Sequence, residues 1–165
     1  MNLSFAAATD ADATTIASLR TAVAEELTRA YGRGHWSSAV TERSVRHGLR
    51  TSTVVVARHG AAIIAVLRLA TKKPWAIDPS YFASARRPLY LSDMAVDPRQ
   101  QRRGVGGRLL EEAKAIARGS GSDAIRLDAY DAPAGAGPFY AKCGFREVGR
   151  VTYRKTPLVY FELIL

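Results

Sequence analysis

The sequence predicts an α+β fold with a mixed, mostly antiparallel sheet of six to seven strands, flanked by about four helices. Three observations support this. Strand-like and helix-like segments follow in the order β-α-α-β-β-β-α-β-α-β-β, an early hairpin surrounds His59-Gly60, and a strand–helix–strand unit begins near residue 89. A length of 165 residues suits one domain, and no repeat or low-complexity linker interrupts it. We therefore expect a single domain over residues 1–165.

The first half of the chain predicts one strand, two helices and a hairpin. Thr9 to Asp12 supply N-cap residues for the first helix, and its apolar residues recur every three or four positions, on one face. Residues 31–36 break that helix. The predicted elements are a strand over 2–7, helices over 13–30 and 38–49, and strands over 53–58 and 61–70.

The second half opens with a long segment, residues 71–88, that contains prolines and aromatic residues but little periodicity. Such long loops are often functional. The sequence leaves open whether Trp75, Tyr81 and Phe82 in this loop line a pocket or pack beneath it. The later predicted elements are a strand over 89–96, a helix ending near Arg118, a strand over 124–130, a short helix over 136–142, and closing strands over 145–154 and 158–165.

The composition restricts the class of protein. No apolar run reaches the roughly 18 residues that a membrane helix needs, and the N-terminus lacks the charged-then-apolar order of a signal peptide. We therefore expect a cytoplasmic protein with no membrane partner. Cys143 is the single cysteine, and the histidines stand twelve residues apart (His35, His47 and His59), so neither a disulfide nor a metal site is expected.

The net charge is +9, from 24 basic and 15 acidic residues, and 19 of the basic residues are arginine. Arginine matches the geometry of phosphate and carboxylate groups, so an anionic partner is consistent with this composition. The basic residues occur at most in adjacent pairs, whereas nucleic-acid arms cluster five to eight of them. This pattern argues against a nucleic-acid partner.

A glycine-rich turn, Gln101 to Arg108, lies between a predicted strand and an amphipathic helix. Glycines let the backbone approach a ligand closely, and the free N–H groups of a first helical turn form an anion site. A diphosphate is the expected ligand. A P-loop would need Lys-Ser/Thr after Gly107, where Arg108-Leu109 stands, and the dinucleotide fingerprint would need a third glycine at Leu109.

Three segments resemble the GNAT superfamily of acetyl-CoA-dependent N-acetyltransferases. The turn matches Gln/Arg-x-x-Gly-x-Gly/Ala, and the strand before it matches apolar-x-x-apolar-x-Val-x-Pro. Phe139 to Phe145 matches Phe/Leu-Tyr-x-x-x-Gly-Phe. The matching residues of the turn and strand are Gln101, Gly104, Gly106, Leu91, Met94, Val96 and Pro98. The motifs follow in the family's order along nearly the whole chain.

The resemblance implies a GNAT-like fold and roles for individual residues. Tyr140 would act as general acid toward the departing thiolate. The backbone of the strand would pair with the pantetheine arm, and one of its amides would polarise the acetyl carbonyl. The implied cofactor-binding residues are Met94, Ala95 and Val96 for the pantetheine arm, and Gln101, Arg102, Arg103, Gly104, Val105, Gly106, Gly107 and Arg108 for the pyrophosphate.

The general base is less well defined by the sequence. Asp93 in the central strand and Asp128 in the next strand are candidates by position, and Asp93 is assigned beside Tyr140 as catalytic. His35 with Trp36 could line the acceptor pocket.

One position departs from the family pattern. Pro133 stands where the family often has asparagine, and Asp131 could replace that contact with the cofactor. Cys143 has no partner base and no nucleophile motif, so we expect it to be structural.

The predicted activity is transfer of the acetyl group of acetyl-CoA to a primary amine, by direct attack in a ternary complex and without a metal. The expected partners are a coenzyme A thioester and an amine acceptor, with a monomer or homodimer as the assembly. The alternatives are a non-catalytic acyl-CoA-binding or regulatory module and, from the charge alone, a nucleic-acid-binding domain. The sequence leaves the acceptor open among polyamines, aminoglycosides, amino acids and protein amines.

Overall fold

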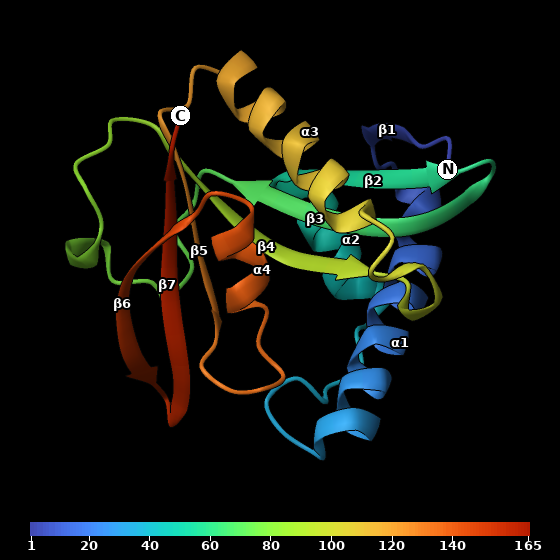
Figure 1. Cartoon of the computed structure of the whole chain (residues 1–165). Helices are drawn as coiled ribbons and strands as arrows, with labels where there is room; N and C mark the ends of the chain where they lie inside the picture. The colour runs from blue at the N-terminus through green and yellow to red at the C-terminus, as the bar shows by residue number, and fades with distance from the viewer. The chain divides into compact units, whose positions relative to one another are not determined.

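The computed structural model describes all 165 residues, which form seven strands and four α-helices (Figure 1). The strand order is β1-β2-β3-β4-β5-β7-β6. The elements are β1 (Ser4–Ala7), α1 (Ala13–Tyr31), α2 (Glu42–Thr51), β2 (Thr53–His59), β3 (Ala62–Ala70), β4 (Pro88–Val96), α3 (Val105–Gly119), β5 (Ala124–Tyr130), α4 (Gly137–Lys142), β6 (Arg146–Tyr153) and β7 (Thr156–Ile164).

The sheet is mixed. β4 and β5 pair in parallel through Pro88–Tyr90 and Ala124–Arg126, whereas β1/β2, β2/β3, β5/β7 and β6/β7 pair antiparallel. The predicted α+β class with a mostly antiparallel mixed sheet is therefore confirmed. None of the helices combines the length and the apolar composition that a membrane crossing requires.

The chain forms two compact units. The first contains Met1–Leu69 and Asp93–Ala113, and the second contains Ala70–Ser92 and Lys114–Leu165. Strand β4 and helix α3 each pass from one unit to the other. The single domain over 1–165 stays a prediction.

The core of the first unit lies between helices α1 and α2 and strands β2 and β3. Apolar side chains from these elements pack against one another. This burial stabilises the amphipathic helices and the β-branched strands at the positions that the sequence pattern predicts. The cluster consists of Ala13, Ile16, Ala17, Leu19, Val45, Val54, Val56, Ile63, Val66 and Ala95.

Helix α2 begins four residues later than predicted. Thr41 is its N-cap, because the Thr41 hydroxyl accepts a hydrogen bond from the N–H of Ser44 (3.2 Å). The preceding residue is held elsewhere: the N–H of Val40 donates to the hydroxyl of Thr21 on α1 (3.1 Å). The predicted start at residue 38 was therefore wrong, because the Thr41 side chain caps the helix at that point and Val40 is bonded to α1 instead.

The core of the second unit fixes the long segment before β4. The Tyr160 hydroxyl donates to the carbonyl of Ala76 and accepts from the N–H of Asp78 (3.1 Å). The rings of Tyr81 and Phe82 lie 5.4 and 5.3 Å from that of Tyr160. Phe82 is therefore buried beneath the loop, whereas Tyr81 contacts Tyr160 and stays 43% exposed.

A buried ion pair between Arg126 and Glu162 also binds the long segment before β4. The Arg126 guanidinium donates to the Glu162 carboxylate (3.0 Å) and to the carbonyl of Ala83 (2.6 Å), and the N–H of Ala83 donates back to Glu162 (3.1 Å). Because every one of these polar groups has a partner, the pair stays satisfied although Arg126 and Glu162 are 5% and 2% exposed. Trp75, by contrast, is 83% exposed.

Candidate active site

The turn after β4 is fastened to the strands of the first unit. The N–H of Asp97 donates to the carbonyl of Ile64 on β3 (2.9 Å), and the Gln101 side-chain amide donates to the carbonyl of Val96 (3.1 Å). The Asp97 carboxylate accepts from the N–H and the guanidinium of Arg99, and this partner lowers the pKa of the Asp97 carboxyl. The predicted pyrophosphate segment is thus joined directly to the end of the predicted pantetheine strand.

The turn itself needs unusual backbone angles. Arg102 and Gly104 have φ of 57° and 79°, in the left-handed region. At Gly104 the absence of a side chain removes the steric cost of that conformation. The N–H of Arg108 donates to the carbonyl of Gly104 (3.1 Å), which is the first hydrogen bond of α3. The N–H groups of Val105 to Gly107 precede that bond and have no acceptor within the helix.

Gly107 tests whether the turn suits a diphosphate. It lies inside α3, its φ is not positive, and a Cβ built on it would meet no atom within 4 Å. A glycine inside a helix costs about 1 kcal/mol relative to alanine, and neither packing nor backbone geometry requires it here. The open space over the first helical turn, next to free N–H groups at the positive end of the helix dipole, fits a phosphate-bearing ligand.

The arginines of the turn differ in their contacts. Arg103 donates to the side-chain oxygen of Gln100 (2.8 Å). The Arg108 guanidinium donates to the carbonyl of Met1 (3.0 Å) and lies 5.7 Å from the ring centre of Phe5. Arg102 and Arg103 are exposed and lie in the sequence just before the first turn of α3.

Asp93 lies within strand β4 and has a positive φ of 56°. Aspartate is one of the few residues that tolerate this conformation. Its two carboxylate oxygens contact different guanidinium groups: Arg20 of α1 at 2.7 Å and Arg68 of β3 at 3.3 Å. Sequence reasoning identified Asp93 but missed both partners, because they lie 73 and 25 positions earlier in the chain.

Arg20 is partly removed from water by this arrangement. Burial lowers the pKa of Arg20, the Asp93 carboxylate opposes that change, and the nearby charge of Arg68 adds to it. One carboxylate therefore balances two guanidinium groups.

Tyr140 lies on helix α4 in the second unit and is 7% exposed. The rings of Phe139, Phe145 and Phe161 surround it, with centroids at 5.3, 5.7 and 6.1 Å. Burial raises the pKa of the Tyr140 phenol, and the negative charges of Asp128 and Cys143 add to this effect. The hydroxyl consequently stays protonated at every pH at which the protein would work.

Asp128 lies on β5 opposite Tyr160 of β7. Burial raises the pKa of the Asp128 carboxyl. The structure brings Asp128 and Tyr140 into electrostatic contact in the second unit, while Asp93 and the cofactor-binding residues lie in the first.

Pro133 and its suggested substitute Asp131 differ in their surroundings. Pro133 is exposed, and the Asp131 carboxylate pairs with the guanidinium of Arg150 (3.2 Å). The N–H of Asp131 donates to the carbonyl of Pro157 (3.0 Å). Cys143 follows α4, where its carbonyl accepts from the Lys114 ammonium group (2.8 Å).

Two further predictions concern Trp36 and the absence of a metal site. The Trp36 indole donates to the carbonyl of Gly32 (3.0 Å), at the break after α1. No group of three or more His, Cys, Asp or Glu side chains in the structure could hold a metal ion.

The comparison with known families assigns the class of protein to which this mixed sheet, glycine-rich turn and helix belong. Residues 50–147 match the family described as "Acetyltransferase (GNAT) domain". The chain belongs to this family of acyltransferases. A search of curated protein sequences finds no match.

Solved structures share the fold over nearly the whole chain. A ribosomal-protein-alanine N-acetyltransferase from Brucella melitensis has 18% identity and a TM-score of 0.75, covering 98% of this chain and 99% of its own. The structure of yncA from Salmonella typhimurium with its cofactor acetyl-CoA has 16% identity and a TM-score of 0.72, covering 99% and 94%. An N-acetyltransferase from Staphylococcus aureus has 15% identity and a TM-score of 0.72, covering 99% of each chain.

Proposed function

We propose that this protein is an N-acetyltransferase that transfers the acetyl group of acetyl-CoA to a primary amine by direct attack in a ternary complex. The observation that carries the proposal is the first turn of α3, where Gly107 leaves the space over three free N–H groups open. That arrangement suits the diphosphate of coenzyme A, and a solved structure with the same fold contains acetyl-CoA.

The thioester would supply the acetyl group and a thiolate leaving group. The N–H groups of Val105 to Gly107 would hold the pyrophosphate, with Arg102 and Arg103 adding positive charge. The backbone of Met94 to Val96 would pair with the pantetheine arm. An N–H group of that strand, aimed at the developing oxyanion, is typically worth about 2.7–4 kcal/mol of transition-state stabilisation.

Tyr140 would donate its proton, or a hydrogen bond, to the departing sulfur. The amine nitrogen bonds to the acetyl carbon, the carbon–sulfur bond breaks, and the amine loses a proton to a base. The raised pKa of Tyr140 supports a donor role, since a buried phenol of this kind remains in the hydroxyl form.

Two carboxylates remain candidates for accepting the amine proton. Asp93 is held between two guanidinium groups, which occupy both of its carboxylate oxygens. Asp128 has a pKa raised by burial, which brings its proton affinity nearer to that of a base working at neutral pH. Asp128→Asn and Asp93→Asn distinguish them: the variant of the true base loses kcat while retaining its affinity for acetyl-CoA.

The proposal is tested by following release of free thiol from acetyl-CoA with a panel of amines. Tyr140→Phe is expected to lower kcat by about 100-fold or more, while the Kd of coenzyme A measured by calorimetry stays nearly unchanged. Tyr90→Phe is the matched control, because it also removes a hydroxyl from a buried tyrosine of the second unit. Full activity of Tyr140→Phe would remove Tyr140 from the mechanism.

A non-catalytic acyl-CoA-binding module is the second candidate. The observation that favours it is the pair formed by Asp131 and Arg150, beside a proline where the family often has asparagine. Tight binding of acetyl-CoA without turnover across the whole amine panel would support this candidate over the enzyme.

A further inference from the structure

A cavity of about 510 Å³ opens in the first unit beside Asp93 of β4. This volume falls in the range of sites for small molecules. Its lining comes from α1, α2, β3 and β4 and contains Arg20, Arg43, His47, Arg50, Arg68 and Asp93. The site is therefore assembled from four elements of one compact unit.

The cavity has an excess of positive charge. Four guanidinium groups face one carboxylate, and Asp93 already contacts both Arg20 and Arg68. The remaining basic groups, at positions 43, 47 and 50, recur at intervals of four and three residues and so share one face of α2. Arg43 and Arg50 are exposed and form no ion pair.

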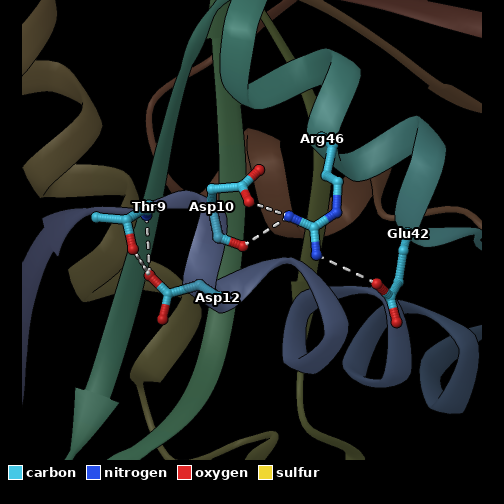
Figure 2. A network of polar contacts seen from close by, with 5 residues as sticks. All are labelled: Thr9, Asp10, Asp12, Glu42 and Arg46. Carbon is cyan, nitrogen blue, oxygen red and sulfur yellow. Dashed lines mark hydrogen bonds and ion pairs between the residues drawn. The ribbon is translucent and has the colours of Figure 1, made fainter.

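Arg46 of the same helix, by contrast, has its positive charge neutralised by carboxylates. The Arg46 guanidinium contacts the carboxylates of Asp10 and Glu42, as Figure 2 shows. The Asp10 carbonyl also accepts from it (3.2 Å), and Asp12 closes the adjoining turn by accepting from Thr9 (2.9 Å). Positive charge on α2 is thus neutralised at Arg46 and left uncompensated in the cavity.

Gly48 makes room for one of the cavity arginines. A Cβ at this position would lie 3.2 Å from the Arg68 guanidinium nitrogen and 3.3 Å from its Cδ. A glycine in the interior of a helix costs about 1 kcal/mol relative to alanine. Helix α2 accepts that cost at the one place where the Arg68 side chain passes beneath it.

We propose that this cavity binds the anionic group, a carboxylate or a phosphate, of a small amine acceptor. The inference rests on the proposed function and narrows its substrate class. Guanidinium groups recognise both anions with paired hydrogen bonds. Asp93 directly precedes Met94, whose strand is assigned to the acetyl group, so an anion bound in the cavity anchors the acceptor beside that strand.

The first test uses pairs of amines that differ only in the anion. One pair is an amino acid and its decarboxylated amine, and the other is phosphoethanolamine and ethanolamine. The anionic member of at least one pair is expected to have a kcat/KM about 10- to 100-fold higher in the wild-type protein. The better pair identifies carboxylate or phosphate as the group bound.

The double variant Arg43→Gln/Arg50→Gln should lose most of this preference, chiefly through a higher KM for the anionic amine. Arg46→Gln is the control, since it removes one charge from the same helix outside the cavity. Equal kcat/KM for both members of each pair in the wild-type protein would overturn the inference. So would retention of the preference in the double variant, or its loss in Arg46→Gln.

A binding experiment separates failure of this inference from failure of the proposed function. Inorganic phosphate is titrated into the protein by calorimetry with coenzyme A at saturation, so that the turn before α3 is filled. Saturable phosphate binding that is lost in the double variant supports the cavity as an anion site, even if no amine is acetylated. Absence of such binding in the wild-type protein, with amines turned over, overturns the cavity while the acetyltransferase stands.

Discussion

The first unit contains two regions suited to anions, and they are built differently. The turn before α3 presents backbone N–H groups around Gly104 and Gly107, whereas the cavity over α2 presents the side chains of arginines. Backbone donors are fixed by the helix and carry partial charges. Guanidinium groups carry full charges on long side chains that keep conformational freedom.

Because the donors differ, the two regions should respond differently to substitution. The turn would hold a ligand through backbone N–H groups beside space that Gly107 leaves empty, so placing a negative charge in that space should weaken binding. The cavity accepts a ligand through an excess of charge, so changing its charge should tune binding up or down. Substitutions at Gly107, Asp93 and Gly48 each change one of these regions and leave the other unchanged.

Adding a carboxylate to the turn should give the largest effect. Gly107→Glu places a negative charge in space where a Cβ meets no atom, so the fold tolerates it and helix propensity increases. Repulsion of the phosphates should weaken coenzyme A binding by on the order of 100-fold, measured by calorimetry. Gly107→Ala, which adds a methyl group without charge, serves as the control for helix propensity. A Gly107→Glu protein with wild-type affinity would show that the turn does not hold the diphosphate.

Removing the single carboxylate should strengthen the cavity as an anion site. Asp93→Asn keeps a residue that tolerates the positive φ and leaves Arg20 and Arg68 without their counter-charge. We expect affinity for inorganic phosphate to rise by about tenfold, because the net charge of the cavity increases by one. The loss of two ion pairs should lower the free energy of unfolding by about 1 kcal/mol. Unchanged phosphate affinity would contradict the role assigned to the charge excess.

Asp128 differs from Asp93, which is paired with two arginines, because burial raises the pKa of the Asp128 carboxyl. A carboxyl whose pKa is higher in the folded state costs stability once the pH exceeds its unfolded pKa of about 3.9. Asp128→Asn should therefore raise Tm relative to the wild-type protein at pH 8, and the difference should shrink to nothing as the pH falls below that value. Thermal unfolding across pH 3 to 8 measures this, and a Tm difference independent of pH would argue against a buried ionised Asp128.

The turn could be predicted from the sequence because its residues are contiguous. Gln101 to Arg108 carry the glycines, the charges and the helix start within eight positions, and the structure joins them to β4 through Gln101 and Val96. The same holds for the α+β class, since each helix and strand shows its own periodicity. The start of α2 was harder to predict: Val40, just before the N-cap Thr41, is bonded to Thr21 of α1, a contact that only the folded chain forms.

The cavity could not be predicted, because its residues come from four separated segments. Asp93 stood out only as an acid in a central strand, and nothing local indicated Arg20 and Arg68 as its partners. Most arginines looked like evenly spread surface charge in the sequence. Only the packing of α1 and α2 on the strands brings four of them around one carboxylate.

Changing the contact between Gly48 and Arg68 should give the smallest effect on the cavity. Gly48→Ala should displace the Arg68 guanidinium, whose end is flexible, by a few tenths of an ångström. The gain of about 1 kcal/mol in helix propensity offsets the crowding, so Tm should change by only a few degrees. Phosphate affinity should nevertheless fall several-fold, because hydrogen bonds to a guanidinium weaken steeply with misalignment. Gly119→Ala is the matched control, since it adds a methyl group to a helical glycine with no atom within 4 Å. If both alanine variants bind phosphate equally well, the place of Arg68 beneath Gly48 has no part in holding the anion.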